Sequence, residues 1–338
     1  MFPQVRVGII GCGLRGRLFA RALADLPGVS VPAVCDLDNA RAEAVAAEIG
    51  AKPMSLDSLV AAGIDAVVVA TPDGAHVAPV QAAAAHGLHI FLEKPVATSS
   101  ADALRIRDAV KSAGVLCTVA CLNRWHPAFA AMLAAAAEGR LGDIVSQNAR
   151  LSNSLAIPTR MLAWAAQSSP GWFLMPHSLD LVVALAGVGA CRVQAVGRRG
   201  LLASRGIDTW DGLQAVIEFA AGSIACVESL WVLPEGAPSA VSFQFEAIGT
   251  LAAARVEDSR QGLELIGENV QHPRAFVQDM HGRIAGPNLG MIADFVRSVR
   301  TGIPCDPGID AGVRVVQVIE AVHASARDRH AIDLPALT

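Results

Sequence analysis

The first 120 residues alternate short, mainly apolar runs with segments of helical periodicity. The apolar runs cover residues 5–10, 31–35, 66–70, 88–92 and 115–119. Because these runs show almost no polar alternation, both faces of the sheet that they form must be covered, and the helical segments between them supply the cover. The pattern predicts an α/β domain with a doubly wound parallel sheet.

After about residue 140 the segments become longer and alternate between apolar and polar residues. Strands are predicted at residues 144–151, 193–197, 213–219, 223–232 and 241–248, and helices at 289–300 and 312–327. Alternation of this kind is typical of an antiparallel sheet with one solvated face. We therefore predict a domain at 1–122 and an α+β domain at 123–338 with a large, mostly antiparallel open sheet. The C-terminal segment is a candidate for packing back on the first domain.

Composition excludes several classes of protein. A hydrophobic content of 53% with 17% charged residues argues against disorder, and a net charge of −4 offers no footprint for nucleic acid. No uncharged apolar stretch reaches the roughly 20 residues of a membrane span. The seven scattered cysteines suggest neither a disulfide framework nor a metal site, and we expect no leader sequence, because no basic segment or cleavage site precedes the first strand. We expect a cytoplasmic protein without a bound metal.

A glycine-rich loop joins the first strand to the first helix. Its sequence is Gly11-Cys12-Gly13-Leu14-Arg15-Gly16, a G-x-G-x-x-G match in the strand–helix context that the motif requires. The first glycine makes a tight turn, the second lets a pyrophosphate approach the backbone, and the third allows close packing of helix on strand. The helix N-terminus then offers N–H donors to phosphates. The loop predicts a dinucleotide-binding Rossmann domain.

Asp36 strengthens this prediction. It lies 20 residues after Gly16, directly after the second strand, where a carboxylate accepts hydrogen bonds from an adenosine ribose. A carboxylate repels a 2′-phosphate, so NAD is favoured, although NADP is not excluded because Arg15 or Arg17 is able to swing towards such a phosphate. Asp36 also has an interpretation without a ligand, in which it caps the N-terminus of the next helix. Asp38 is the other candidate for that cap.

Four further motifs make the chain resemble the glucose-fructose oxidoreductase / inositol dehydrogenase / MocA family over nearly its whole length. They are Thr71-Pro72 with His76, Glu93-Lys94-Pro95, Asn123-Arg124-Trp125-His126-Pro127 and Pro176-His177-Ser178-Leu179-Asp180. The resemblance implies an NAD(H)-dependent oxidoreductase that acts on a secondary hydroxyl or ketone, or on a lactol or lactone, of a sugar, inositol or related cyclic polyol. It also implies a homodimer or homotetramer formed through the open face of the second sheet.

The same resemblance assigns roles to individual residues. Lys94 would lie beside the nicotinamide and the substrate oxygen, His177 would exchange the hydroxyl proton, and Asp180 would hold the histidine or a substrate hydroxyl. The implied cofactor contacts, in addition to the glycine loop and Asp36, are Thr71, Pro72, His76, Glu93, Lys94 and Asn123, and the implied substrate contacts are Arg124 and Trp125.

The chemistry of these groups suits the reaction. A histidine has a pKa near 6.5 and exchanges protons readily, and an ammonium stabilises a developing alkoxide. Lys94 is one of only three lysines among 27 basic residues. Pro95 restricts the backbone of Lys94 to extended conformations, and we predict a cis bond between the two residues.

One departure from the family concerns Phe173, which stands where many sugar- and polyol-oxidising members carry an aspartate four residues before the histidine. The segment is apolar, and Trp172 becomes a candidate for packing against a sugar ring. Two of the candidate residues also have an interpretation without catalysis. His177 is then a helix N-terminal residue with no chemical role, and Asp180 is a carboxylate in the first turn of that helix. Glu93 has such an interpretation too, as a salt-bridge partner of a nearby arginine. The functional alternatives are an NAD-retaining glycosidase and a sugar-sensing regulator without catalysis.

Overall fold

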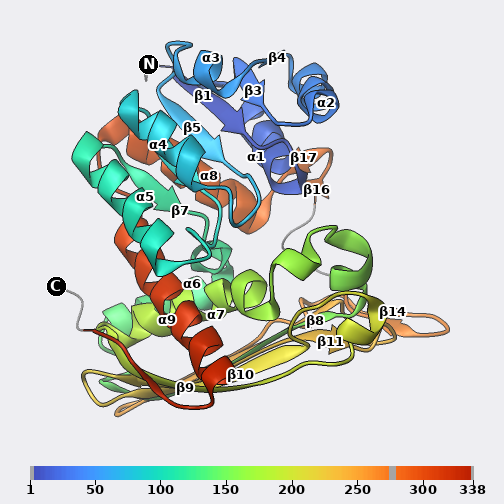
Figure 1. Ribbon diagram of the computed structural model, residues 1–338, viewed down its shortest axis with the longest axis vertical. Coiled ribbons are helices and arrows are strands. Elements are labelled where there is room, and N and C mark those ends of the chain that lie inside the picture. Colours follow the sequence, from blue (N-terminus) through green and yellow to red (C-terminus); the bar gives the residue numbers. More distant parts are fainter. Residues whose placement is uncertain (1–3, 274–278, 336–338) are drawn as a thin grey trace. The chain divides into compact units, whose positions relative to one another are not determined.

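The computed structural model describes residues 4–273 and 279–335 (Figure 1). These residues form two compact units. Unit 1 holds residues 4–125 and 279–316, and unit 2 holds residues 126–273 and 317–335. The division into functional domains at 1–122 and 123–338 stays a prediction. None of the helices in the described residues combines the length and apolarity needed to cross a membrane.

Unit 1 is built on a parallel sheet with the strand order β4-β3-β1-β5-β6-β7, and β2 extends the edge of β1. All pairs of neighbouring strands in this sheet are parallel, including the short pair between β2 and the start of β1. The strands are β1 (Val5–Ile10), β2 (Val29–Ser30), β3 (Ala33–Cys35), β4 (Lys52–Pro53), β5 (Ala66–Val69), β6 (His89–Leu92) and β7 (Cys117–Val119). The order reverses beside β1, as in a doubly wound sheet, and this confirms the predicted fold class.

Helices cover both faces of this sheet. On one face α1 contacts α2 and α8, and on the other α4 contacts α3 and α5 (Figure 1). The helices are α1 (Leu14–Ala24), α2 (Asn39–Ile49), α3 (Leu56–Val60), α4 (Val77–Ala85), α5 (Ser100–Ala113), the 3-10 turn η1 (Leu122–Trp125) and α8 (Gly286–Thr301), with the short hairpin of β16 (Asp279–Met280) and β17 (Arg283–Ile284). The sheet is therefore buried on both sides, which explains the absence of polar alternation in its strands.

Capping residues and glycines mark the two ends of these helices, as α2 shows. The Asp38 side chain accepts a hydrogen bond from the N–H of Arg41 and so caps α2, and Gly50 ends α2 in the left-handed conformation. The core of unit 1 joins distant segments, because Phe91 of β6 packs between Phe19 of α1 and Phe295 of α8 at ring-centroid distances of 4.9 and 5.4 Å. This aromatic stack makes α8 part of unit 1.

Unit 2 contains a seven-stranded sheet in the order β13-β12-β8-β11-β10-β9-β18. Only the β8–β11 pair is parallel among the described strands of this sheet. The strands are β8 (Ile144–Ser154), β9 (Ala190–Arg198), β10 (Gly212–Phe219), β11 (Ile224–Leu233), β12 (Val241–Gly249), β13 (Ala253–Glu257) and β18 (Ile332–Asp333), with the small pair β14 (Leu265–Ile266) and β15 (Val270–Gln271) beside them in the chain. The predicted large, mostly antiparallel sheet is confirmed.

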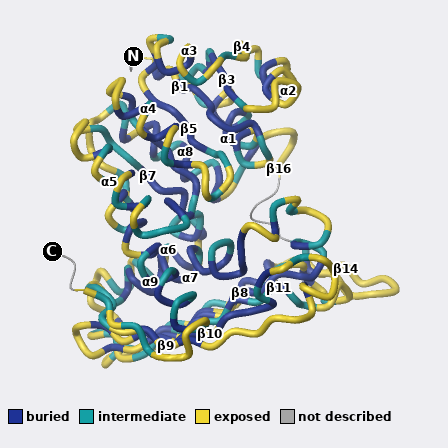
Figure 2. Tube along the Cα trace, viewed as in Figure 1, coloured by how far each residue is buried: buried dark blue, intermediate teal, exposed yellow. Residues whose placement is uncertain are grey.

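One face of this sheet is covered by helix α7, which contacts β8, β10 and β11. The strands alternate between buried and exposed residues, so the other face of the sheet is solvated (Figure 2). The remaining helical elements are α6 (Pro127–Ala137), a π-turn η2 (Ile157–Met161), the 3-10 turns η3 (Ala165–Gln167) and η4 (Ala203–Arg205), α7 (Pro170–Ala186) and α9 (Ile309–Asp328), whose residues from 317 on belong to unit 2.

Helix α7 corrects the structural interpretations of His177 and Asp180. The helix begins at Pro170, with Ser169 accepting a hydrogen bond from the N–H of Trp172, and it continues through Pro176. A proline has no N–H to donate, so one intrahelical hydrogen bond is missing, but the packing of α7 on the sheet maintains the helix. His177 and Asp180 therefore lie in mid-helix, not at a helix N-terminus.

Candidate functional site

The residues predicted to bind the cofactor follow five strands of the parallel sheet. The glycine loop comes after β1, Asp36 after β3, Thr71 after β5, Glu93-Lys94 after β6, and Asn123 after β7. The carboxyl ends of parallel strands meet at one edge of a sheet, so unit 1 brings all these residues to the same edge. The site is centred on β1, where the strand order reverses.

The three glycines of the loop each have a distinct steric reason. Gly11 has φ +93°, and a Cβ there would lie 2.6 Å from the backbone of Ala70. A Cβ on Gly16 would lie 1.7 Å from the carbonyl oxygen of Gly11, so this glycine permits close packing of α1 on the loop. By contrast, a Cβ on Gly13 would meet nothing within 4 Å. The backbone at Gly13 therefore faces open space, as a loop that receives a pyrophosphate must.

The N-terminus of α1 is suited to an anion. No side chain caps it, and its first turn contains no acidic residue. The first N–H groups of a helix carry partial positive charge and have no intrahelical acceptor. Leu14, the first helical residue, is 76% exposed. This end of α1 is thus able to donate backbone hydrogen bonds to a phosphate.

Asp36 is held beside the glycine loop. Its Oδ2 accepts a hydrogen bond from the N–H of Cys12 at 2.7 Å, and its Oδ1 accepts one from the N–H of Asp38 at 2.9 Å. Burial, reinforced by the Asp36 charge, raises the pKa of the Cys12 thiol to about 12, so Cys12 stays a neutral small side chain. Since Asp38 is the N-cap of α2, the capping role that was open for Asp36 belongs to Asp38.

Both arginines considered as 2′-phosphate ligands already have carboxylate partners. Arg15 Nε lies 2.5 Å from Glu93 Oε1, and Arg17 Nε lies 2.6 Å from Glu48 Oε2. Arg15 also donates to the Oδ1 of the buried Asn288 on α8 at 3.0 Å. No local pattern in the sequence pointed to Asn288, which lies 273 positions from Arg15.

Glu93 connects the glycine loop to Lys94. Its carboxylate is paired with Arg15, and its other oxygen accepts a hydrogen bond from the N–H of Lys94 at 3.1 Å. The salt-bridge interpretation of Glu93 is therefore confirmed. The Lys94–Pro95 bond is cis, as predicted. Lys94 is half-buried at the end of β6.

His76 holds two loops of this edge together. The residue is 1% exposed. Its Nδ1 lies 2.9 Å from the carbonyl oxygen of Pro95, and its Nε2 lies 3.1 Å from the carbonyl oxygen of Thr71. The structure thus shows His76 as a bridge between the loops after β5 and β6, and its predicted contact with the cofactor stays a prediction.

The motif after β7 is anchored within unit 1. Arg124 Nη1 lies 2.6 Å from Asp306 Oδ2, and the indole N–H of Trp125 donates to Asp294 of α8 at 2.8 Å. Asn123 is buried. These contacts give Arg124 and Trp125 structural partners, and their predicted contacts with substrate stay predictions.

In unit 2, one face of α7 carries the other candidate residues. Phe173, His177 and Asp180 are spaced by four and three residues, which places them on the same side of the helix. His177 is half-buried and Asp180 is 2% exposed. A half-buried imidazole with a buried carboxylate three residues along the same helix face is a suitable arrangement for exchanging a proton.

Trp172 points to another side of α7. Its ring stacks on His323 of α9 with an interplanar angle of 11° and a centroid distance of 5.0 Å. Ser169 Oγ lies 2.7 Å from His323 Nε2, and His323 Nδ1 lies 2.8 Å from the carbonyl oxygen of Ile319. The predicted contact between Trp172 and a sugar ring stays a prediction, whereas its packing on His323 is a property of the structure.

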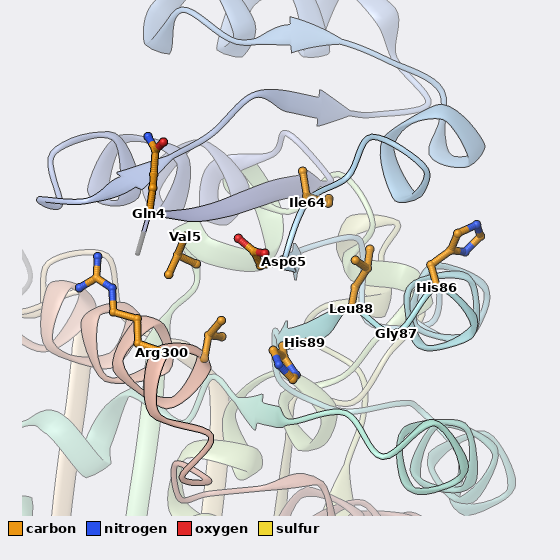
Figure 3. Close-up of a pocket in the computed structure, with 10 residues that line it drawn as sticks. Gln4, Val5, Ile64, Asp65, His86, Gly87, Leu88, His89 and Arg300 are labelled. Atoms are coloured by element: carbon orange, nitrogen blue, oxygen red, sulfur yellow. The ribbon is translucent and has the colours of Figure 1, made fainter. Parts of the chain in front are cut away.

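A cavity of about 350 Å³ lies elsewhere in unit 1 (Figure 3). Its lining includes Val5, Asp65 and His89, which stand at the amino ends of β1, β5 and β6. Ligands of doubly wound sheets bind at the carboxyl ends of the strands, so this cavity is not the candidate site. Among the described residues, no group of three or more His, Cys, Asp or Glu side chains is placed to hold a metal ion.

Two family models match the chain. Residues 5–121 match the model described as "Oxidoreductase family, NAD-binding Rossmann fold", and residues 129–255 match the "GFO/IDH/MocA C-terminal domain". Together the two matches cover most of the chain and correspond to the parallel sheet and to most of the second sheet.

Curated proteins and solved structures agree with these matches. The chain is 30% identical over 259 residues to the scyllo-inositol 2-dehydrogenase (NAD(+)) of Bacillus subtilis (74% of this chain and 73% of the relative). It is 29% identical over 345 residues to the inositol 2-dehydrogenase of Acidothermus cellulolyticus (99% and 97%). Its fold is similar to that of the scyllo-inositol dehydrogenase of Lactobacillus casei, solved with NAD(H) and scyllo-inositol, with a TM-score of 0.85 at 18% identity (98% and 99%).

Proposed function

Because this chain belongs to the GFO/IDH/MocA family of NAD-binding oxidoreductases, we propose that its substrate is a sugar, an inositol or a related cyclic polyol. The protein is an NAD-dependent oxidoreductase that acts on CH–OH groups. The proposed reaction interconverts a secondary hydroxyl and a ketone, or a lactol and a lactone. Relatives named as inositol dehydrogenases over nearly the full chain support this substrate class.

The observation that carries the cofactor assignment is the geometry around Gly13. Open space at its Cβ position, the uncapped α1 N-terminus and the carboxylate of Asp36 lie at the switch point of the sheet. These features fit a dinucleotide, with the pyrophosphate at the helix end and the adenosine ribose at Asp36. Since Arg15 and Arg17 are paired with carboxylates, we propose that NAD is preferred to NADP.

The proposed roles of the residues follow from their chemistry. When bound, the nicotinamide ring supplies the hydride acceptor or donor. Lys94 donates a hydrogen bond to the reacting substrate oxygen and stabilises its negative charge. His177 takes the hydroxyl proton as the alcohol is oxidised and returns it in the reverse direction. Asp180 orients the imidazole of His177.

Two cofactor-site residues, His76 and Glu93, hold the loops of this edge in place. His76 fixes the loops after β5 and β6 through their carbonyl groups, so the Thr71-Pro72 turn and Lys94 keep a constant spacing. Glu93 fixes the backbone N–H of Lys94 and is itself neutralised by Arg15. Loops held in this way need to move little during the reaction, so the reacting groups keep their positions.

We also propose a location and an assembly. All seven cysteines carry free thiols, which suits the reducing cytoplasm. The solvated face of the second sheet exposes Val196, Val216, Ile224 and Ile248 to between 39% and 64%. Burial of this apolar surface by a second copy supports a homodimer or homotetramer. Light scattering of wild type and Val216→Lys tests it, since a lysine there would favour the monomer.

The decisive experiment measures NADH formation by the purified protein with NAD or NADP and a panel of inositols, hexoses and sugar acids. We expect net, stoichiometric reduction of NAD by at least one substrate class. Cleavage of glycosides without accumulation of NADH would favour the NAD-retaining glycosidase. Tight binding of NAD without turnover of any panel member would favour the regulator.

A further inference from the structure

Phe173 lies at the centre of a cluster of three aromatic side chains, which we call the aromatic cluster. Its ring centroid is 5.9 Å from that of Trp164 and 5.6 Å from that of Trp231, with interplanar angles of 59° and 58°. The three residues come from separate elements, since Trp164 precedes the turn η3, Phe173 belongs to α7 and Trp231 belongs to β11. Tertiary packing alone assembles this cluster.

The aromatic cluster adjoins His177 along α7. Phe173 precedes His177 by four residues, and side chains at this spacing are neighbours on a helix surface. Phe173, Trp164 and His177 are all half-buried, whereas Trp231 is 0% exposed beneath them. Two aromatic rings therefore present accessible surface on the same side of α7 as the proposed proton-exchanging group.

The chemistry of this surface selects among substrates. Because Trp231 is fully buried, the accessible part of the aromatic cluster carries one polar group, the indole N–H of Trp164, which is a donor without acceptor capacity. A substrate edge that carries several hydroxyl groups would lose hydrogen bonds to water against it. An aromatic group would instead gain apolar contact and ring-to-ring packing in tilted or offset geometry.

We propose that the aromatic cluster is a substrate subsite, and that the substrate is a sugar or cyclitol derivative with an aromatic substituent that packs against Phe173 and Trp164. This inference rests on the proposed function, because it places His177 at the reacting hydroxyl. It goes further in naming the group that accompanies the oxidised ring. Phe173 and Trp164 determine specificity, and they take no part in moving the proton or the hydride.

The test compares matched substrates that differ only in the substituent. Phenyl and methyl glycosides of glucose, galactose and mannose are assayed for NADH formation, together with the free sugars and myo-inositol. We expect kcat/KM for the phenyl glycoside to exceed that for the methyl glycoside of the same sugar by about tenfold or more. Phe173→Leu and Trp164→Leu should reduce this ratio towards one, mainly through KM. Phe173→Asp should reverse it in favour of the hydroxylated substrates.

Two controls separate specificity from damage to the fold. Trp210→Leu changes another half-buried tryptophan of unit 2, one that stacks with Arg199, and it should leave the ratio unchanged. The dissociation constant of NAD, a property of unit 1, should be equal in all variants. If Phe173→Asp does not fold, the ratio of kcat/KM for phenyl and methyl glycosides in Phe173→Leu and Trp164→Leu still tests the proposal.

The outcomes are distinct. A wild-type enzyme that oxidises free sugars or myo-inositol at least as well as every phenyl glycoside overturns the subsite and leaves the oxidoreductase assignment intact. A ratio unaffected by Phe173→Leu and Trp164→Leu also overturns it. Tight NAD binding without NADH formation from any substrate contradicts the proposed function instead.

Discussion

Arg15 of the glycine loop forms an ion pair with Glu93, the residue before Lys94, at 2.5 Å. The two residues lie 78 positions apart in the sequence. The pair connects the loop proposed to receive the pyrophosphate to the loop that carries the candidate catalytic lysine. Because the Glu93 side chain is only 7% exposed, Arg15 supplies a counter-charge where little water reaches the carboxylate.

Removal of Arg15 should therefore destabilise unit 1. We expect Arg15→Ala to lower the free energy of unfolding by about 1–3 kcal/mol, since it leaves a buried carboxylate without its counter-charge. Glu93→Gln in the Arg15→Ala background should recover part of this loss, because an amide needs no counter-charge. Thermal unfolding of the two single variants and the double variant measures the coupling, and additive effects would contradict it.

The glycine loop predicts opposite results for two substitutions of the same kind. Gly16→Ala should strongly destabilise the protein, because its Cβ would overlap the carbonyl oxygen of Gly11. Gly13→Ala should leave the melting temperature without cofactor unchanged, since its Cβ meets nothing within 4 Å. The same methyl would occupy the path of the pyrophosphate and weaken NAD binding by about tenfold or more. Equal NAD affinity in Gly13→Ala and wild type would place the phosphates elsewhere.

Asp36 should govern the choice of cofactor. Asp36→Asn removes the charge that we propose binds the ribose hydroxyls and repels a 2′-phosphate, and we expect the Kd for NAD to rise roughly tenfold or more. The Kd for NADP should rise less or fall. Asp38→Asn provides the matched control, because asparagine caps a helix as well as aspartate does. Cofactor titrations by fluorescence measure both constants.

Lys94 and His177 should affect turnover more than cofactor binding. We expect Lys94→Ala and Lys94→Arg to reduce kcat by about 10²–10³. His177→Asn should reduce it by about 10²–10⁴. Lys111→Ala, which breaks an exposed ion pair with Asp310, is the control and should retain full activity. Wild-type kcat in either Lys94 variant would exclude the assigned role.

His323 predicts a pH dependence of stability. Burial lowers the pKa of this imidazole, which accepts a hydrogen bond from Ser169 and stacks on Trp172. The unfolded chain binds the proton more readily than the folded one, so stability is present above the unfolded pKa of about 6.5 and is lost as the pH falls below it. The melting temperature should fall between pH 7.5 and 5.5 in wild type. The fall should be smaller in His323→Gln, and equal slopes would contradict the prediction.

Local patterns predicted much of unit 1 and less of unit 2. The strand β1 has the predicted bounds, and the glycine loop and Asp36 follow β1 and β3. These features depend on neighbours in the sequence, such as caps, glycines and apolar runs. Helix α7 did not follow from its sequence, because Pro176 resembles a helix start and only packing on the sheet carries the helix through it.

The sequence alone determined that a parallel sheet would place Lys94, Asp36 and the glycine loop at one edge, because the carboxyl ends of parallel strands must meet there. Which side chains surround these residues depends on how distant segments of the chain fold together. Asn288 reaches Arg15 from 273 positions away, and Phe173 meets Trp164 and Trp231 from three separate elements. Periodicity shows which face of an element is buried, but the partner on that face depends on how distant segments pack.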